Sequence, residues 1–257
     1  MQVFRQLEQW LQWRKLQQQS IGFVATMGAL HAGHLELVEQ SLNNNVITVV
    51  SIFINPAQFD QQADLDAYPV ELVQDLQLLQ SAGVDAVLIP TVEEIYADKH
   101  RYKVIETDYS LKLCGAHRPA HFEGVLTVVL KLLNLVRPQR AYFGEKDWQQ
   151  LTLVSEMVQA FFMSVEIVPV ATIRESDGLA MSSRNSRLSA DERLLASELY
   201  SVISSADSAA KATQQLLSAG FEVDYVADHN STRGQRRLAA VRLGNTRLID
   251  NVGLDNE

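Results

Sequence analysis

The segment Thr26–His34 reads TMGALHAGH and places two histidines beside two glycines. His31 and His34 are three residues apart, so in helical geometry their side chains share one face. Gly28 and Gly33 let the backbone approach a ligand closely. Imidazole and backbone donors in such a loop could bind a triphosphate and stabilise the charge that develops on departing pyrophosphate. The alternative is that both histidines are partly exposed loop and capping residues.

A second segment, residues 143–151, reads FGEKDWQQL and combines glycine with charged side chains. Gly144 permits a tight turn, and Lys146 is a compact positive charge suited to phosphate. The start of the helix that follows adds its dipole. Asp147 could accept a hydrogen bond from a ribose hydroxyl, or it could be an ordinary helix cap. Lys146 could likewise be a solvated lysine of the turn.

Two further segments carry weaker signals. Residues 181–185 read MSSRN, in which two hydroxyl groups and Arg184 could close over phosphate oxygens. Residues 55–59 read NPAQF, and Gln58 there follows a strongly apolar run. Each of these segments, taken alone, could be an ordinary polar loop.

The elements that would position these segments alternate between strand and helix. Short runs of apolar, β-branched residues predict strands buried on both faces, at Ile21–Thr26, Val46–Ile54, Val84–Ile89, from Ala141 onward, and Val165–Val170. Periodic apolar residues predict helices around them, at 4–11, 34–42, 68–83, 122–136 and 147–161. Such alternation indicates an α/β fold with a Rossmann-like, doubly wound parallel sheet. Three of the four candidate segments follow predicted strands, so the sheet would bring them to one edge.

The pattern changes after about residue 172. Ser189 and Glu192 form a capping box, and a helix of small residues is predicted over Ala206–Ser218. Residues 238–249 predict two strands joined by a two-residue turn at Gly244–Asn245. We therefore expect a first domain over residues 1–172 and a smaller C-terminal α+β domain over residues 173–257.

Composition limits the classes of function. The 257 residues include 22 Lys and Arg against 31 Asp and Glu, a net charge of −9 that disfavours a protein that coats nucleic acid. Residues 16–98 contain no Lys or Arg, so an anion site there must use backbone amides, histidine or basic groups from elsewhere. The single cysteine, Cys114, excludes an intrachain disulfide and thiolate-rich metal sites. With no signal-peptide pattern and no apolar run of membrane length, we expect a cytoplasmic protein.

Two other kinds of site deserve weight. A metal site could be built from the four histidines that occur in pairs, His31, His34, His117 and His121. No acidic residue sits at a telling spacing beside them. An RNA-contacting surface is supported only by the arginines near the C-terminus, Arg233, Arg236, Arg237, Arg242 and Arg247. Residues 171–257 nevertheless carry a net charge of −2, so we expect no nucleic-acid partner.

Taken together, the segments resemble the pantothenate synthetase (pantoate–β-alanine ligase) family. They are TMGALHAGH, SIFINPAQF, HRPAHFEGVLTVV, FGEKDWQQL and DGLAMSSRN, and the resemblance runs from about Ile21 to Leu188 and resumes at RLIDN, residues 247–251. The His-x-Gly-His element alone marks a wider nucleotidyltransferase superfamily. The sequence departs from the family at Ala25, where proline is usual, and at Ala120, where glycine is usual. The C-terminal domain is also shortened between about residues 206 and 238.

The resemblance implies an ATP-dependent condensation of pantoate with β-alanine to pantothenate, a coenzyme A precursor. Pantoate would attack the α-phosphate of Mg-ATP, giving pantoyl adenylate and pyrophosphate, and the amine of β-alanine would then displace AMP. The resemblance also implies a homodimer joined through the first domain, and from the apolar pattern we expect no membrane partner. The alternative is another adenylate- or cytidylate-forming nucleotidyltransferase with a different acceptor.

The same resemblance assigns site residues by position. Catalytic roles fall on His31, His34, Lys146 and Arg184. Pantoate would be bound by Gln58 and Gln150, and β-alanine by Gln58. ATP would be bound by Met27, Gly28, His31, Gly33, His34, Gly144, Glu145, Lys146, Asp147, Ile173, Met181, Ser182, Ser183 and Arg184. The ligands of Mg²⁺ stay open.

Overall fold

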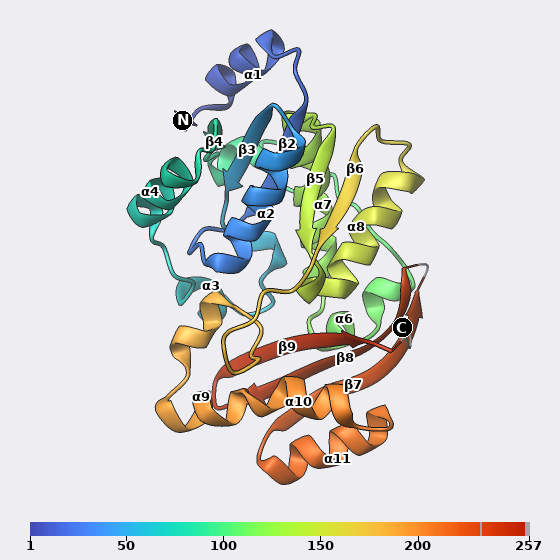
Figure 1. The fold of residues 1–257 in the computed structure, drawn as a ribbon. Coiled ribbons are helices and arrows are strands. Elements are labelled where there is room, and N and C mark those ends of the chain that lie inside the picture. Colours follow the sequence, from blue (N-terminus) through green and yellow to red (C-terminus); the bar gives the residue numbers. More distant parts are fainter. Residues whose placement is uncertain (232, 255–257) are drawn as a thin grey trace. The chain divides into compact units, whose positions relative to one another are not determined.

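The computed structural model describes residues 1–231 and 233–254. Within them, a six-stranded sheet has the order β1-β4-β3-β2-β5-β6, and every neighbouring pair is parallel (Figure 1). Its strands are β1 (Gln2–Phe4), β2 (Ile21–Thr26), β3 (Ile47–Ile52), β4 (Ala86–Leu88), β5 (Arg140–Gly144) and β6 (Glu166–Val170). The predicted Rossmann-like parallel sheet is therefore confirmed.

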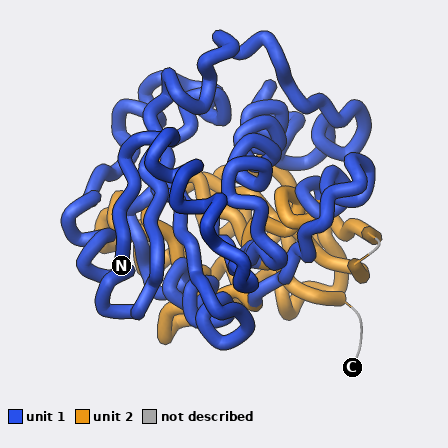
Figure 2. Tube along the Cα trace, turned by 90° about the horizontal axis from the view of Figure 1, so that it is seen from above, with its two compact units in different colours: residues 1–144, 153–170 blue, residues 145–152, 171–257 orange. Residues whose placement is uncertain are grey.

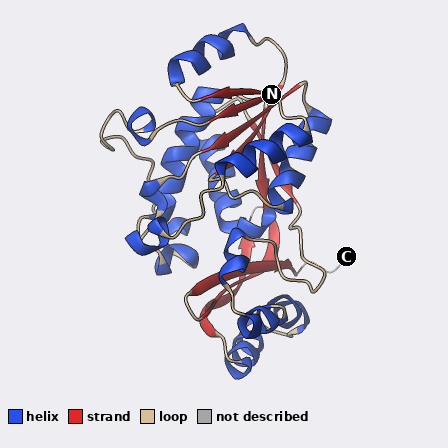
Figure 3. Cartoon of the chain, turned by 90° about the vertical axis from the view of Figure 1, so that its left-hand side faces the viewer, coloured by secondary structure: helices blue, strands red, loops and turns tan. Residues whose placement is uncertain are grey.

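Helices lie on both sides of these strands (Figure 3). The α-helices are α1 (Leu7–Leu16), α2 (Ala32–Asn44), α3 (Gln62–Asp66), α4 (Leu72–Ala82), α5 (Val92–Ile95), α6 (Cys114–His117), α7 (His121–Val136) and α8 (Trp148–Ala160). Short 3-10 turns are η1 (Pro56–Gln58), η2 (Tyr109–Leu111), η3 (Glu145–Asp147) and η4 (Ser183–Arg187). Burial on both faces explains the continuous apolar runs of the central strands.

The core on one face of this sheet joins α2 and α4 to the central strands. Val38 of α2 and Leu79 of α4 pack against Val24, Val50 and Val87, and all five are buried. Gly83 ends α4 in the left-handed conformation, as its sequence position indicates. None of the helices in the described residues is long and apolar enough to span a bilayer.

The N-terminal segment differs from the predicted single helix. Phe4 belongs to β1, which pairs with β4, and α1 begins only at Leu7. The ring of Phe4 packs edge-on against Trp10 with centroids 5.5 Å apart. The helical spacing of these aromatic residues thus reflects packing across a strand–helix turn rather than one continuous helix.

A second sheet, of three antiparallel strands in the described residues, has the order β7-β8-β9. Its strands are β7 (Glu222–Ser231), β8 (Gly234–Leu243) and β9 (Thr246–Gly253). Three helices precede them in the sequence, α9 (Ala190–Ala196), α10 (Glu198–Ser205) and α11 (Ala209–Ala219). The predicted hairpin at Gly244–Asn245 joins β8 to β9, and the capping box of Ser189 and Glu192 begins α9. Strand β7 was not predicted, because its alternation is interrupted by polar residues.

Packing divides the chain into two compact units (Figure 2). Unit 1 contains residues 1–144 and 153–170, and unit 2 contains residues 145–152 and 171–257. The turn η3 and the start of α8 therefore group with the C-terminal residues rather than with the strand that precedes them. Each unit has its own core and its own share of the predicted site residues.

Candidate functional site

The two histidines of the TMGALHAGH loop form a capping box at the start of α2. His31 is the N-cap, and its Nδ1 accepts from the backbone N–H of Gly33 at 3.2 Å. The Nδ1 of His34 accepts from the backbone N–H of His31 at 3.4 Å, and the two ring centroids are 4.1 Å apart. Because Nδ1 accepts in both rings, Nε2 carries the proton in the neutral form. The capping interpretation and the donor interpretation are therefore compatible, because Nδ1 accepts within the cap while Nε2–H can still donate.

The backbone before His31 is held by a residue that the sequence analysis did not single out. Asp75 of α4 is buried, and its two carboxylate oxygens accept from the N–H groups of Ala29 at 2.9 Å and Leu30 at 2.8 Å. Gly28 has φ +82°, and a Cβ there would lie 2.9 Å from the Asp75 carboxylate. The signal for Asp75 was its place between Leu72 and Leu79, on the apolar face of α4.

A chain of hydrogen bonds orients the Gln58 side chain. Burial raises the pKa of Tyr96 to about 12, and its hydroxyl donates to Asn55 Oδ1 at 2.5 Å. The Nδ2 of Asn55 donates to Gln58 Oε1 at 3.0 Å, which leaves Gln58 Nε2 3.2 Å from Met27 Sδ. The structure thus brings together two predicted site residues, Met27 and Gln58. Asn55 and Tyr96 were not predicted, although Asn55 begins the NPAQF segment.

The main chain of Gln58 is held from the RPAH segment. His121 Nδ1 lies 2.8 Å from the Gln58 carbonyl oxygen, and Arg118 Nη2 donates to the same oxygen at 3.3 Å. A Cβ at Gly124 of α7 would lie 2.2 Å from the Ala57 carbonyl oxygen. Only glycine therefore lets α7 approach this turn so closely.

In unit 2, Lys146 joins two segments that are far apart in sequence. Its Nζ donates to the Met181 carbonyl oxygen at 2.7 Å, and the Met181 N–H donates to the Ile173 carbonyl oxygen at 2.9 Å. Burial lowers the pKa of Lys146, and the charges of Arg184 and Arg174 act in the same direction. Asp147 and Asp250 oppose that shift. The alternative of an ordinary solvated lysine is therefore disfavoured, because the ammonium group of Lys146 donates to the main chain of another segment.

The MSSRN segment leads into the 3-10 turn η4 and supplies its first three residues. Ser182 is its N-cap, and Ser182 Oγ accepts from the Arg184 N–H at 3.2 Å. Ser183 begins the turn, and Asn185 Nδ2 donates to the Ala180 carbonyl oxygen at 3.2 Å. The segment is therefore an ordered turn rather than an irregular loop.

The remaining predicted residues are placed as follows. Gly33 lies in the first turn of α2, and Gly144 ends β5. Glu145 and Asp147 lie in η3, and Gln150 lies in the first turn of α8. Met27, Gly28, His31, Gly33, His34, Gln58 and Gly144 belong to unit 1, and Glu145, Lys146, Asp147, Gln150, Ile173, Met181, Ser182, Ser183 and Arg184 belong to unit 2.

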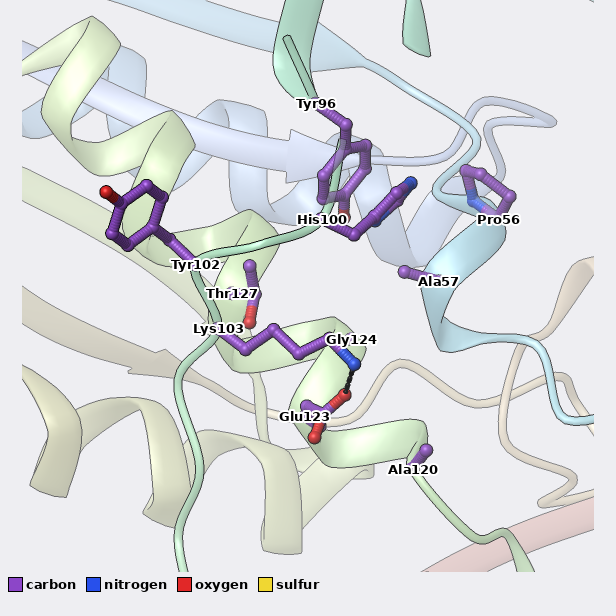
Figure 4. A pocket seen from close by; sticks show the side chains of 10 residues that line it. All are labelled: Pro56, Ala57, Tyr96, His100, Tyr102, Lys103, Ala120, Glu123, Gly124 and Thr127. Atoms are coloured by element: carbon purple, nitrogen blue, oxygen red, sulfur yellow. Dashed lines mark hydrogen bonds and ion pairs between the residues drawn. The ribbon is translucent and has the colours of Figure 1, made fainter. Parts of the chain in front are cut away.

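A cavity of about 360 Å³ in unit 1 is bordered on one side by Pro56 and Ala57 of the NPAQF turn (Figure 4). It is lined by Pro56, Ala57, Tyr96, His100, Tyr102, Lys103, Ala120, Glu123, Gly124 and Thr127. The rings of Tyr96 and His100 stack with centroids 3.9 Å apart, and Lys103 pairs with Glu123 at 2.7 Å. No predicted site residue lines this cavity, so it is distinct from the predicted site.

In the part of the chain that the structure describes, no group of three or more His, Cys, Asp or Glu side chains is arranged to hold a metal ion. The four-histidine metal site considered from the sequence therefore has no support in the described geometry. Mg²⁺ usually keeps several waters and is bound through substrate phosphates with few protein ligands, so such a site is not required for Mg-ATP.

A doubly wound parallel sheet with a donor-rich loop after β2 defines an α/β protein of the nucleotide-binding class. The profile of the Pantoate-beta-alanine ligase family matches residues 1–253. The chain belongs to this family and is a ligase that joins pantoate to β-alanine. The resemblance inferred from the motifs is thereby confirmed.

Individual relatives agree along nearly their whole length. The chain is 52% identical to pantothenate synthetase of Bdellovibrio bacteriovorus over 98% of both chains, and 45% identical to that of Legionella pneumophila over 98% and 99%. Among solved structures, pantoate–β-alanine ligase of Francisella tularensis superposes with a TM-score of 0.92 at 36% identity, over 98% of this chain and 97% of that one. That structure is described as a complex with β-γ ATP and β-alanine. Pantothenate synthetase of Thermus thermophilus gives a TM-score of 0.90 at 40% identity, over 98% and 99%.

Proposed function

We propose that this ligase works through a pantoyl-adenylate intermediate formed from ATP, and that the FGEKD and MSSRN segments supply residues to the reaction together. The observation that carries this proposal is the bond between Lys146 Nζ and the Met181 carbonyl oxygen. It joins the FGEKD turn to the MSSRN turn, and both contain residues that the family resemblance assigns to ATP.

In the first step, a carboxylate oxygen of pantoate attacks the α-phosphorus of ATP, and the bond to pyrophosphate breaks. Negative charge then grows on the departing phosphate oxygens. We assign the Nε2–H groups of His31 and His34, together with Lys146 and Arg184, to the stabilisation of that charge. The capping box supports this role, because it fixes both imidazole rings before the substrate arrives.

Pantoate must be held without losing its nucleophilic character. Gln58 and Gln150 are neutral amide donors, which orient a carboxylate without neutralising it as a bidentate arginine would. The Asn55 contact supports this role for Gln58, since it turns the donating Nε2 away from Asn55. Gln58 would also contact β-alanine.

In the second step, the amine of β-alanine attacks the acyl carbon of the adenylate. A carbon–nitrogen bond forms, the bond to the AMP phosphate oxygen breaks, and the amine loses a proton. Adenylates hydrolyse readily, so exclusion of water is required. We propose that the smaller C-terminal domain, residues 173–257, acts as the lid that excludes it.

Other contacts to ATP follow the family assignment. Gly28 and Gly33 would admit the phosphates to the backbone, Asp147 would bind ribose, and Ile173 would contact adenine through its main chain. The remaining contacts would come from Met27, Gly144, Glu145, Met181, Ser182 and Ser183. Mg²⁺ would enter with ATP, and the cytoplasm is the expected compartment.

The test is AMP release from Mg-ATP, with pantoate and β-alanine added separately and together. AMP that requires both substrates, with pantoate-dependent ATP–pyrophosphate exchange in the absence of β-alanine, is the expected result. Exchange that proceeds with another acid but not with pantoate would favour the alternative, a related nucleotidyltransferase with a different acceptor. AMP without exchange would contradict an adenylate intermediate.

A further inference from the structure

A side chain near the C-terminus holds the turn that carries Lys146. Asn251 of β9 is buried, and its Nδ2 donates to the carbonyl oxygens of Glu145 at 2.9 Å and Lys146 at 3.0 Å. Its Oδ1 accepts from Arg236 Nη1 at 2.7 Å. These residues all belong to unit 2.

The chemistry of the partners fixes which way the Asn251 amide points. A guanidinium group can only donate, so the atom that faces Arg236 must be the oxygen. A carbonyl oxygen can only accept, so the atom that faces Glu145 and Lys146 must be the nitrogen. The arrangement therefore uses both N–H groups of the amide, and the reverse orientation would lose all three bonds.

Arg236 is itself held in place. Its Nη2 pairs with Glu145 Oε2 at 2.7 Å, and its guanidinium lies 4.0 Å from the centroid of the buried Trp148 ring. Glu145 is thus bound twice, through its main chain by Asn251 and through its side chain by Arg236. Glu145, Arg236 and Asn251 therefore contact one another in a closed ring. This ring fixes the backbone of Glu145 and Lys146.

We propose that Asn251 is a positioning residue for Lys146, and that Arg236 orients Asn251 for this task. A lysine side chain is a flexible four-carbon stem, so its ammonium group is placed reproducibly only if its backbone is fixed. The inference rests on the proposed function only for the consequence in catalysis. The effect on the placement of Lys146 is independent of the reaction.

Asn251→Asp is the most specific variant. It preserves size and an oxygen toward Arg236, but it turns an acceptor toward two carbonyl oxygens and removes both donors. Asn230→Asp is the matched control, because Asn230 is an exposed residue of β7 in the same sheet. Arg236→Lys is the second variant, since an ammonium group can pair with Glu145 but lacks the fork that also reaches Asn251.

The first readout is independent of activity. Trace acetylation with acetic anhydride, followed by mass spectrometry, gives the labelling rate of Lys146 relative to the exposed Lys15 in the same sample. Loss of two hydrogen bonds should raise this ratio by about tenfold in Asn251→Asp, and less in Arg236→Lys. Asn230→Asp should leave it unchanged. The measurement is made well below the thermal midpoint of each variant.

The second readout is pantoate-dependent ATP–pyrophosphate exchange. Misplacement of Lys146 should lower its maximal rate by about 10²-fold in Asn251→Asp, while the KM for pantoate changes little. An unchanged labelling ratio in Asn251→Asp would overturn the proposal. If that variant does not fold, an unchanged ratio in Arg236→Lys would overturn it. A lower thermal midpoint with an unchanged labelling ratio in Asn251→Asp would show that Asn251 acts on stability alone. If the wild-type protein shows no exchange, the proposed function is refuted, but the labelling result on Lys146 stays valid.

Discussion

At the scale of single residues, the direction of each hydrogen bond decides what a side chain can do. His31 and His34 use Nδ1 to cap α2, so only Nε2 can donate to a substrate. Asp75 uses both oxygens on the loop backbone, which fixes the loop rather than leaving a carboxylate for chemistry. The motif alone indicates which residue types are present, but not which of their atoms are already in use.

His34→Ala should lower the rate of adenylate formation by about 10²–10³-fold, because one donor to the transition state is lost. Pantoate-dependent ATP–pyrophosphate exchange measures this step directly. His117→Ala, at an exposed position of α6, is the control and should exchange normally. Near-normal exchange in His34→Ala would remove His34 from the catalytic group.

Ala120→Gly should stabilise the protein by about 1 kcal/mol. Ala120 precedes α7 with φ +63°, a left-handed conformation that is strained for alanine and not for glycine. The entropy that glycine adds to the unfolded chain offsets part of the gain. Urea unfolding measures the difference.

Ala210→Gly is the control for Ala120→Gly, and its expected effect on stability is the opposite. Ala210 is exposed in α11 with helical geometry, so the same substitution there should destabilise the protein by about 1 kcal/mol. If Ala120→Gly also destabilises, the strain assigned to Ala120 is wrong.

At the scale of elements, neighbouring segments are tied by few, well-placed polar contacts. His121 at the start of α7 and Tyr96, the C-cap of α5, both support the NPAQF turn. Ala25, which stands where the family usually has proline, pairs with Ser51 of β3. The strand continues to Thr26, so this substitution lies within regular strand pairing.

Gln58→Ala should raise the KM for pantoate by about 10–100-fold, the scale of a lost hydrogen bond to a charged group. The KM for ATP should change less. Steady-state kinetics with each substrate varied in turn give the KM for pantoate and the KM for ATP separately. Gln62→Ala, the same change at an exposed position of α3, should leave both constants unchanged. Equal effects of Gln58→Ala on both substrates would exclude it from the pantoate site.

The ion pair between Asp98, which follows α5, and Lys131 should make the stability of the protein depend on pH in the acid range. Lys131 of α7 donates to Asp98 at 2.6 Å and to the Ile95 carbonyl oxygen at 2.8 Å, and its bond holds the pKa of Asp98 at about 2. Because the folded-state pKa lies below the unfolded value, this contribution is present above about pH 4 and is lost as the pH falls toward 2. Urea midpoints across this range should fall less steeply in Asp98→Asn.

A double-mutant cycle provides the control for this pH effect. Lys131→Gln should remove the same dependence, and the double variant should add little to either single change. If the urea midpoints of Asp98→Asn and of the wild type depend on pH in the same way, the Lys131 contact does not govern the acid dependence of stability.

At the scale of the whole molecule, the resemblance implies a homodimer joined through the first domain. Unit 1 exposes three large side chains in one segment, Tyr102, Ile105 and Leu111. Sedimentation equilibrium should therefore give about twice the chain mass of 28.8 kDa. Ile105→Asp should shift the distribution toward the monomer, and the wild-type mass of a single chain at micromolar concentration would contradict the prediction.

The sequence by itself determined the parallel sheet, the hairpin at Gly244–Asn245 and the family, because periodicity, turn residues and motif order are local properties of the chain. It did not determine β1 or β7, whose residues form strands only because β4 and β8 offer partners. It also did not reveal the positioning contacts of Asp75, Asn55, Tyr96, Arg236 and Asn251. Each of these residues has a hydrogen-bond partner between 41 and 106 positions away in the sequence. Only the tertiary structure brings such groups within hydrogen-bonding distance, and burial then obliges each of them to find a partner.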